Sequence, residues 1–125
     1  MTVKMLHCCI RVKDLDESLK FYKNIGLIET RRKDYPEHKF SLVYMSTEKG
    51  DYELELTYNY DVEKPYEIGN GFSHIAIGVE NLEETRDKHI ELGYKVTDLK
   101  GLPGQKPNYY FVNDPDGYLV EVIRL

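Results

Sequence analysis

The sequence predicts an α+β fold in which two βαβββ units follow one another within a single domain of 125 residues. The first observation is an internal repeat, because the segment 7–18 aligns without a gap onto the segment 74–85. The second is a helix-start motif directly after the first strand of each repeat. These observations predict a first unit over about 1–60, a linker over 61–71 and a second unit over about 72–125.

The first unit should begin with a strand near Leu6–Val12. A helix is expected next, because Asp14 is a favourable N-cap and Glu17 completes a capping box. Gly26 marks the C-terminal end of this helix. The apolar face of the helix is formed by Leu15, Leu19 and Tyr22. The remaining expected elements are strands at Ile28–Lys33, Phe40–Ser46 and Tyr52–Tyr58, with a turn at Glu48–Asp51.

The second unit should repeat this order, starting with a strand at Ser73–Val79. Asn81 is the expected N-cap of its helix, Glu84 the capping partner and Gly93 the end. Three strands should follow, at Tyr94–Asp98, Tyr109–Val112 and Tyr118–Arg124.

Composition limits the function classes. A net charge of −5 argues against a nucleic-acid partner, because phosphate binding needs clustered Lys and Arg. No apolar run approaches the ~20 residues that span a bilayer. The first residues show no apolar signal-peptide core, so a cytoplasmic location is expected. The only cysteines, Cys8 and Cys9, should point to opposite faces of a strand, which excludes a disulfide between them.

Strand alternation indicates which side chains share a sheet face. In the first strand His7, Cys9 and Arg11 lie on one face, and the opposite face should pack on the helix. In the repeat, His74 shares its face with the small residues Ala76 and Gly78, which leave room for a ligand. Both histidines should therefore line the concave side of the sheet.

A glutamate follows near the end of each unit. Glu55 shares a face with Glu53, Thr57 and Asn59. Glu121 stands in a strand with apolar residues on both faces, which predicts a buried carboxylate that is costly unless it meets a cation or a hydrogen-bond donor.

The repeat turns these residues into a candidate metal site. An isolated strand histidine is usually structural, and a lone glutamate is usually solvated. However, 67 residues separate His7 from His74 and 66 separate Glu55 from Glu121, so the repeat delivers His and Glu equivalently in both halves. Two histidines with two carboxylates suit Ni, Zn, Co, Fe or Mn. The other histidines, His38 and His89, lack such support and are expected at the surface.

Several motifs carry a resemblance to a known family. The chain resembles glyoxalase I (lactoylglutathione lyase), within the vicinal-oxygen-chelate superfamily, over essentially its whole length. The combination of the Glu55–Asn59 run with the Asp-Pro-Asp-Gly-Tyr run is specific to that family. The matching motifs are HCCIRV from His7, Ser18–Tyr22, Phe40–Tyr44, Glu53–Asn59, Gly71–Ala76 and Asp114–Glu121.

The resemblance implies a metal held by His7, Glu55, His74 and Glu121, in a homodimer whose sites take ligands from two subunits. Nickel is the first choice for so compact a chain, with cobalt or zinc next. The implied reaction isomerises the hemithioacetal of methylglyoxal and glutathione to S-lactoylglutathione. Glu121 would be the main general base and Glu55 the second proton carrier. Family glutathione contacts fall on Arg11 and Asn59.

Two departures leave the thiol open. Asn70 stands where long members carry Arg, and Pro107 stands near their late-loop Lys, with Lys106 adjacent. Another low-molecular-weight thiol is therefore an alternative to glutathione. The rival enzyme is a methylmalonyl-CoA epimerase, which typically has Gln at the position of Glu55. Extradiol dioxygenases and fosfomycin-inactivating thiol transferases use three ligands, and binding modules of the bleomycin-resistance type lack the metal set.

Overall fold

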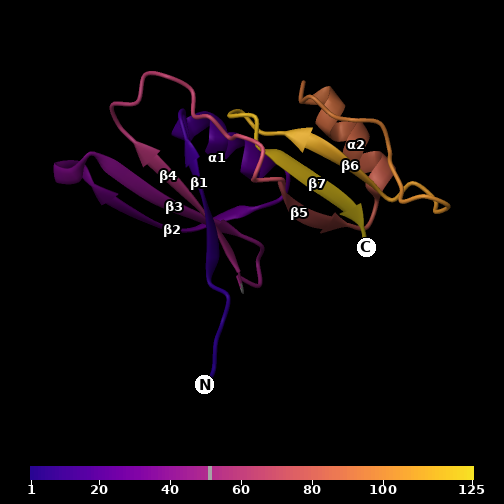
Figure 1. Cartoon of the computed structure of the whole chain (residues 1–125), viewed down its shortest axis with the longest axis horizontal. Coiled ribbons are helices and arrows are strands. Elements are labelled where there is room, and N and C mark those ends of the chain that lie inside the picture. Colours follow the sequence, from indigo (N-terminus) through magenta and orange to yellow (C-terminus); the bar gives the residue numbers. More distant parts are fainter. Residues whose placement is uncertain (51) are drawn as a thin grey trace. The chain divides into compact units, whose positions relative to one another are not determined.

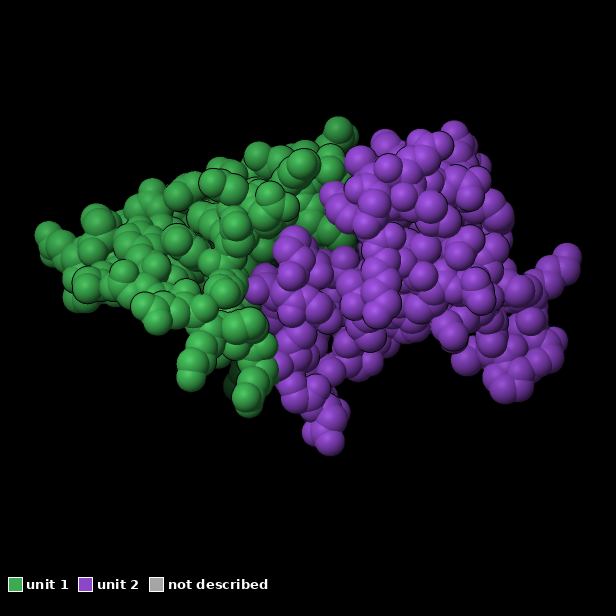
Figure 2. Space-filling view, turned by 90° about the horizontal axis from the view of Figure 1, so that it is seen from above, with its two compact units in different colours: residues 1–67 green, residues 68–125 purple. Residues whose placement is uncertain are grey.

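The computed structural model describes residues 1–50 and 52–125 and divides into two compact units, Met1–Glu67 and Ile68–Leu125 (Figure 1 and Figure 2). The division falls inside the segment 61–71. Each unit has its own sheet and its own helix. Among the described residues, no helix is long and apolar enough to cross a lipid bilayer.

The first unit contains a four-stranded sheet in the order β1-β4-β3-β2. The outer strand β1 runs parallel to β4, whereas β3 is antiparallel to both of its neighbours. The elements are β1 (His7–Val12), α1 (Leu15–Asn24), β2 (Ile28–Tyr35), a 3₁₀ turn (Pro36–His38), β3 (Phe40–Ser46) and β4 (Glu53–Asn59). The expected turn before β4 includes residue 51, which lies outside the described residues.

Helix α1 begins as its sequence predicts. The Asp14 carboxylate accepts a hydrogen bond from the Glu17 backbone N–H at 3.1 Å and so caps the first turn. Gly26 follows the helix with a φ of 112°, a left-handed conformation that favours glycine. The helix buries Leu15, Phe21 and Tyr22.

The second unit contains a three-stranded sheet in the order β5-β7-β6, in which β5 is parallel and β6 antiparallel to β7. Asn81 occupies the N-cap of α2, but its side chain makes no capping hydrogen bond. The elements are β5 (His74–Val79), α2 (Leu82–Glu91), β6 (Tyr109–Asn113) and β7 (Leu119–Arg124).

The strand expected at Tyr94–Asp98 is wrong as a full strand. Only a single antiparallel bridge forms there, between Val96 and Val112. The backbone of Thr97 donates to the Phe111 carbonyl at 2.9 Å, but the Phe111 N–H returns to the Thr97 hydroxyl at 3.0 Å rather than to a carbonyl. The side chain thus replaces a ladder bond, and regular pairing stops after one bridge.

Alternation sets one face of each sheet toward a core and leaves the other face more open. In β1 Ile10 and Val12 are buried, while His7, Cys9 and Arg11 are exposed, as expected. In β7 Val120 and Val122 are fully buried. The opposite face of β7 is only half-buried, so the prediction that both faces are buried is wrong. Glu121 stands on this half-buried face.

Candidate metal and catalytic site

The first unit brings His7 and Glu55 together. The parallel pairing of β1 with β4 sets Cys9 opposite Glu55, so the glutamate lies diagonally from His7 on the same face. The distance from His7 Nε2 to Glu55 Oε2 is 3.5 Å. We call these two residues, which the sequence predicts as metal ligands, the first ligand pair.

The second unit builds the same diagonal with His74 and Glu121, the second ligand pair. Ala76 stands opposite Glu121 in the parallel pairing of β5 with β7, as Cys9 stands opposite Glu55. The distance from His74 Nε2 to Glu121 Oε1 is 3.2 Å. The two pairs therefore occupy equivalent places in their sheets, although the repeat offset changes by one residue between its first and last strands.

Each pair fits two ligands of one divalent ion. Two donors at about 2.1 Å from a metal, subtending 90–110° at the ion, lie about 3.0–3.4 Å apart. The second pair, at 3.2 Å, lies within this range, and the first pair, at 3.5 Å, lies just above it. Their imidazoles are accessible, with about a third of each histidine side chain exposed (36% and 33%). Within the described residues no group of three or more His, Cys, Asp or Glu side chains gathers, and each unit brings together one His–Glu pair.

Polar neighbours hold Glu55 as a carboxylate. Partial burial opposes its ionisation, but hydrogen bonds from Tyr44, Cys9 and Thr57 and attraction by His7 outweigh burial and lower its pKa. The hydrogen bond to Glu55 is also the main reason that the pKa of Tyr44 is raised to about 12. Cys9 Sγ lies 3.1 Å from the Thr57 hydroxyl, and partial burial of the thiol, in a residue that is exposed as a whole, raises the pKa of Cys9. The two cysteines are free, with no disulfide.

The neighbours of Glu121 at the equivalent positions cannot donate hydrogen bonds from their side chains. Strand pairing sets Phe111 against Glu121 as it sets Tyr44 against Glu55. Three further positions change in the same direction: Cys9 corresponds to Ala76, Thr57 to Ile123 and Glu53 to Leu119. In this unit the histidine has a polar neighbour instead, because Ser73 Oγ lies within hydrogen-bond distance of His74 Nδ1, at 2.7 Å.

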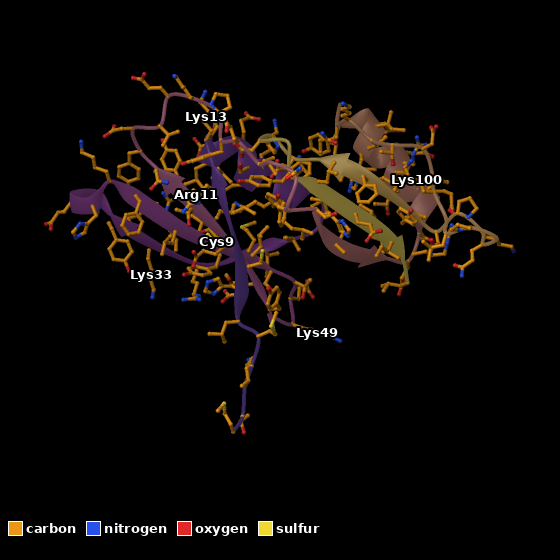
Figure 3. All side chains as sticks on the ribbon, in the orientation of Figure 1. Cys9, Arg11, Lys13, Lys33, Lys49 and Lys100 are labelled. Atoms are coloured by element: carbon orange, nitrogen blue, oxygen red, sulfur yellow. The ribbon has the colours of Figure 1, made fainter. Side chains whose placement is uncertain are left out.

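Arg11 and Asn59 lie on the same sheet face as the first ligand pair. Arg11 is exposed on β1 and pairs in register with Thr57 (Figure 3). Asn59, at the end of β4, donates its amide to the Tyr66 hydroxyl at 3.0 Å. The equivalent of Arg11 in the second unit is Gly78, where an added Cβ would come within 2.6 Å of the Leu125 side chain.

His89 corrects one expectation. His38 is exposed as predicted, but His89 is 1% exposed and hydrogen-bonded to Tyr110 Oη at 2.8 Å. Its burial lowers its pKa, with a smaller contribution from Lys88. The repeat offset aligns His89 with Tyr22, a residue of the buried face of α1, and that alignment is the signal that could have located it.

The tandem arrangement, with one His–Glu pair in each unit, is that of the vicinal-oxygen-chelate class. A family model described as "Glyoxalase/Bleomycin resistance protein/Dioxygenase superfamily" matches residues 4–122. The chain belongs to this superfamily. It is 44% identical to the probable lactoylglutathione lyase of Synechocystis sp., over 96% of this chain and 94% of that protein. It is 41% identical to the lactoylglutathione lyase of Haemophilus influenzae, over 98% and 93%.

Solved structures agree with this assignment. The trypanothione-dependent glyoxalase I of Leishmania major is 37% identical with a TM-score of 0.84, covering 98% of this chain and 87% of that one. Glyoxalase I of Zea mays is 35% identical with a TM-score of 0.87, covering 96% of this chain and 44% of the longer plant chain. The expected fold class and family are therefore confirmed.

Proposed function

We propose that this protein is a lactoylglutathione lyase, which isomerises the hemithioacetal of methylglyoxal and glutathione to S-lactoylglutathione and thereby removes methylglyoxal. The single observation that carries this proposal is the pair of equivalent His–Glu diagonals, in a chain whose relatives bear that enzyme name over nearly their full length.

His7, Glu55, His74 and Glu121 would hold one divalent ion, nickel first and cobalt or zinc next. The donor set of two imidazoles and two carboxylates suits these metals. When bound, the ion supplies Lewis-acid stabilisation of the negative charge that develops on the substrate oxygens.

The surroundings of the two carboxylates support different roles for them. Glu55 is held as an anion by three hydrogen-bond donors, which suits a fixed ligand. Among the described residues, His74 is the polar partner of the Glu121 side chain, and the apolar residues Ala76 and Phe111 stand opposite it in the sheet, so its carboxylate has fewer constraints on its motion. We therefore assign Glu121 as the main general base, and Glu55 chiefly as a metal ligand and secondarily as the second proton carrier.

The proton transfer is an internal exchange between neighbouring carbons. Glu121 removes the proton from the carbon that bears sulfur and hydroxyl, and the electron pair moves to form an enediolate. The proton returns to the adjacent carbon, formerly the ketone, and the proton of the original hydroxyl passes to the oxygen on that carbon. This leaves a thioester carbonyl on the first carbon and a hydroxyl on the second. No oxidant or further reactant is consumed.

Arg11 and Asn59 are the proposed contacts for the glutathione arm. The guanidinium of Arg11 can pair with a carboxylate of the tripeptide, and its side chain is exposed on the face of the first ligand pair. The second unit has Gly78 at this position and closes over it with Leu125. The charge difference favours an anionic thiol arm beside the first unit.

We further propose a cytoplasmic homodimer whose sites each combine the first ligand pair of one subunit with the second pair of the other. A complementation assay tests the shared site. Mixing Glu55→Ala with Glu121→Ala subunits leaves one intact site in each heterodimer, so about a quarter of wild-type activity should return in a statistical mixture. If sites form within one chain, no activity returns. Light scattering gives the oligomeric state independently.

The direct test of the function is an assay of the metal-free protein reconstituted with nickel, cobalt or zinc. We expect thioester formation from methylglyoxal and glutathione with at least one of these metals. If glutathione gives no turnover, the assay is repeated with other low-molecular-weight thiols and with methylmalonyl-CoA. Turnover only with another thiol or only as an epimerase would replace the proposed substrate, and no turnover at all would reject the proposal.

A further inference from the structure

Tyr44 and Phe111 occupy equivalent positions beside the two ligand pairs. Tyr44 packs edge-on against His7 with ring centroids 5.9 Å apart, and Phe111 packs edge-on against His74 at 5.4 Å. Each aromatic residue also stands opposite the glutamate of its pair in the antiparallel ladder. The difference between them is one hydroxyl group, which Tyr44 uses to donate a hydrogen bond to Glu55.

The Tyr44 ring is itself held from the neighbouring strand. The guanidinium carbon of Arg31 lies 3.7 Å from the ring centroid, a cation–π contact. Arg31 Nη2 donates to Glu53 at 3.0 Å and Arg31 Nε contacts both carboxylate oxygens of Glu53 at 3.3 Å. The Thr30 hydroxyl donates to the same carboxylate at 2.6 Å. Arg31 is thus fixed on β2, and it fixes the ring on β3.

Tyr44 is also well placed by packing, because it is only 5% exposed. A buried ring clamped on one face and in contact with His7 has little freedom to turn its hydroxyl away from Glu55. The second unit keeps the edge-on ring but not its polar contacts, since Leu119 replaces Glu53 and Phe111 replaces Tyr44.

We propose that Tyr44, braced by Arg31 and Glu53, is a positioning residue that fixes the Glu55 carboxylate as a metal ligand, and that Phe111 leaves Glu121 free to move a proton. This inference rests on the proposed function and deepens it. Outer partners of metal ligands typically contribute 10–100-fold in affinity or activity, so the effect is measurable.

The test exchanges the two residues and measures metal binding separately from turnover. Tyr44→Phe should weaken cobalt and nickel binding by about 10-fold or more, with kcat at saturating metal changing by less than about 3-fold. Phe111→Tyr should lower kcat by about 10-fold or more, because the new hydroxyl restrains Glu121, while metal affinity is kept. Affinity is read from the cobalt absorption spectrum of the metal-free protein and from competition with a chelator.

Tyr60→Phe is the matched control. It removes a tyrosine hydroxyl that is hydrogen-bonded to Ser41 at 2.7 Å, away from the ligand pair, and should leave metal affinity unchanged. Arg31→Met provides a second variant that keeps the Tyr44 hydroxyl but removes its brace. It should weaken metal binding by a smaller factor, about 3-fold to 10-fold.

The outcomes separate this inference from the proposed function. If the wild-type protein binds metal and turns over substrate, but Tyr44→Phe keeps wild-type metal affinity, the positioning role is rejected and the function stands. Equal loss of metal affinity in Tyr60→Phe would also reject it, because the effect would be structural. If the wild-type protein neither binds metal nor isomerises the hemithioacetal, the proposed function fails first.

Discussion

The two ligand pairs share their backbone geometry and differ in their surroundings. Both glutamates stand diagonally from their histidines on a parallel strand pair, at 3.5 and 3.2 Å. Around Glu55 the neighbours are Tyr44, Cys9 and Thr57, all of which donate hydrogen bonds to it. The equivalent residues around Glu121 are Phe111, Ala76 and Ile123. A repeat can thus preserve the placement of two equivalent His–Glu pairs while it gives the two glutamates different neighbours.

The histidines show the opposite asymmetry. Ser73 lies within hydrogen-bond distance of His74 Nδ1, and the repeat places Leu6 at the corresponding position before His7. A ring nitrogen engaged by a second partner orients the other nitrogen toward a metal. The first unit therefore supports its carboxylate, and the second unit supports its imidazole.

The largest expected effect on turnover concerns the histidine that each ligand pair contains. His7→Ala and His74→Ala should each lower turnover by about 10³-fold, because loss of one ligand removes several kcal/mol of metal-based stabilisation. Metal analysis after dialysis, together with the thioester assay, measures both effects. A histidine variant that retains both metal and turnover would break the equivalence of the two pairs.

The next effect concerns Arg11, whose positive charge has no counterpart at Gly78, the equivalent position of the second unit. Arg11→Ala should raise KM for the hemithioacetal by about 10–100-fold with little change in kcat, because a charge-assisted hydrogen bond contributes about 1.5–3 kcal/mol. Steady-state kinetics separate the two constants. Lys49→Ala, which removes an exposed cation of the same unit, is the control and should leave KM unchanged. An unchanged KM in Arg11→Ala would contradict the proposal that the glutathione arm of the substrate binds on this face of the sheet.

A smaller effect on nickel affinity should follow from loss of the hydrogen bond between Ser73 and His74. Ser73→Ala should weaken nickel binding by about 3-fold to 10-fold, because His74 loses its orienting partner. Leu6→Ala, the change at the corresponding position, should leave nickel affinity unchanged. Competition with a chelator measures both affinities. Equal affinities of Ser73→Ala and the wild-type protein would show that the hydrogen bond does not orient the ligand.

The smallest expected effect is a pH dependence of folding stability, which His89 on α2 should cause and the equivalent residue on α1 should not. Burial lowers the pKa of His89 from its ordinary value of 6.5, whereas the equivalent residue of α1 is the buried Tyr22. As pH falls below about 6.5, the unfolded state takes up a proton that the folded state resists, so stability is lost toward acid. Thermal unfolding between pH 5 and 7 should show this decline. His89→Gln should flatten the curve, and an unchanged slope would assign the decline to other groups.

The sequence identified the residues of the two His–Glu pairs better than it predicted the surroundings of those pairs. The repeat located His7, His74, Glu55 and Glu121, because offsets of 67 and 66 residues can be read from the sequence without knowledge of the strand pairing. Tyr44 was seen only as part of a motif, since its position beside Glu55 depends on the register between β3 and β4. Val96 was expected within a strand, but a threonine side chain interrupts its ladder. Such effects depend on tertiary contacts that local patterns do not contain.

The unequal roles of the two glutamates are the central claim, and Glu121→Gln measured beside Glu55→Gln tests it most directly. At saturating nickel, Glu121→Gln should abolish measurable isomerase activity, a fall of about 10²–10⁴-fold or more, while the protein stays folded. Glu55→Gln should chiefly weaken nickel binding and retain more of its turnover once the metal is supplied. Retained activity in folded Glu121→Gln, or a greater loss of kcat in Glu55→Gln, would contradict the assignment.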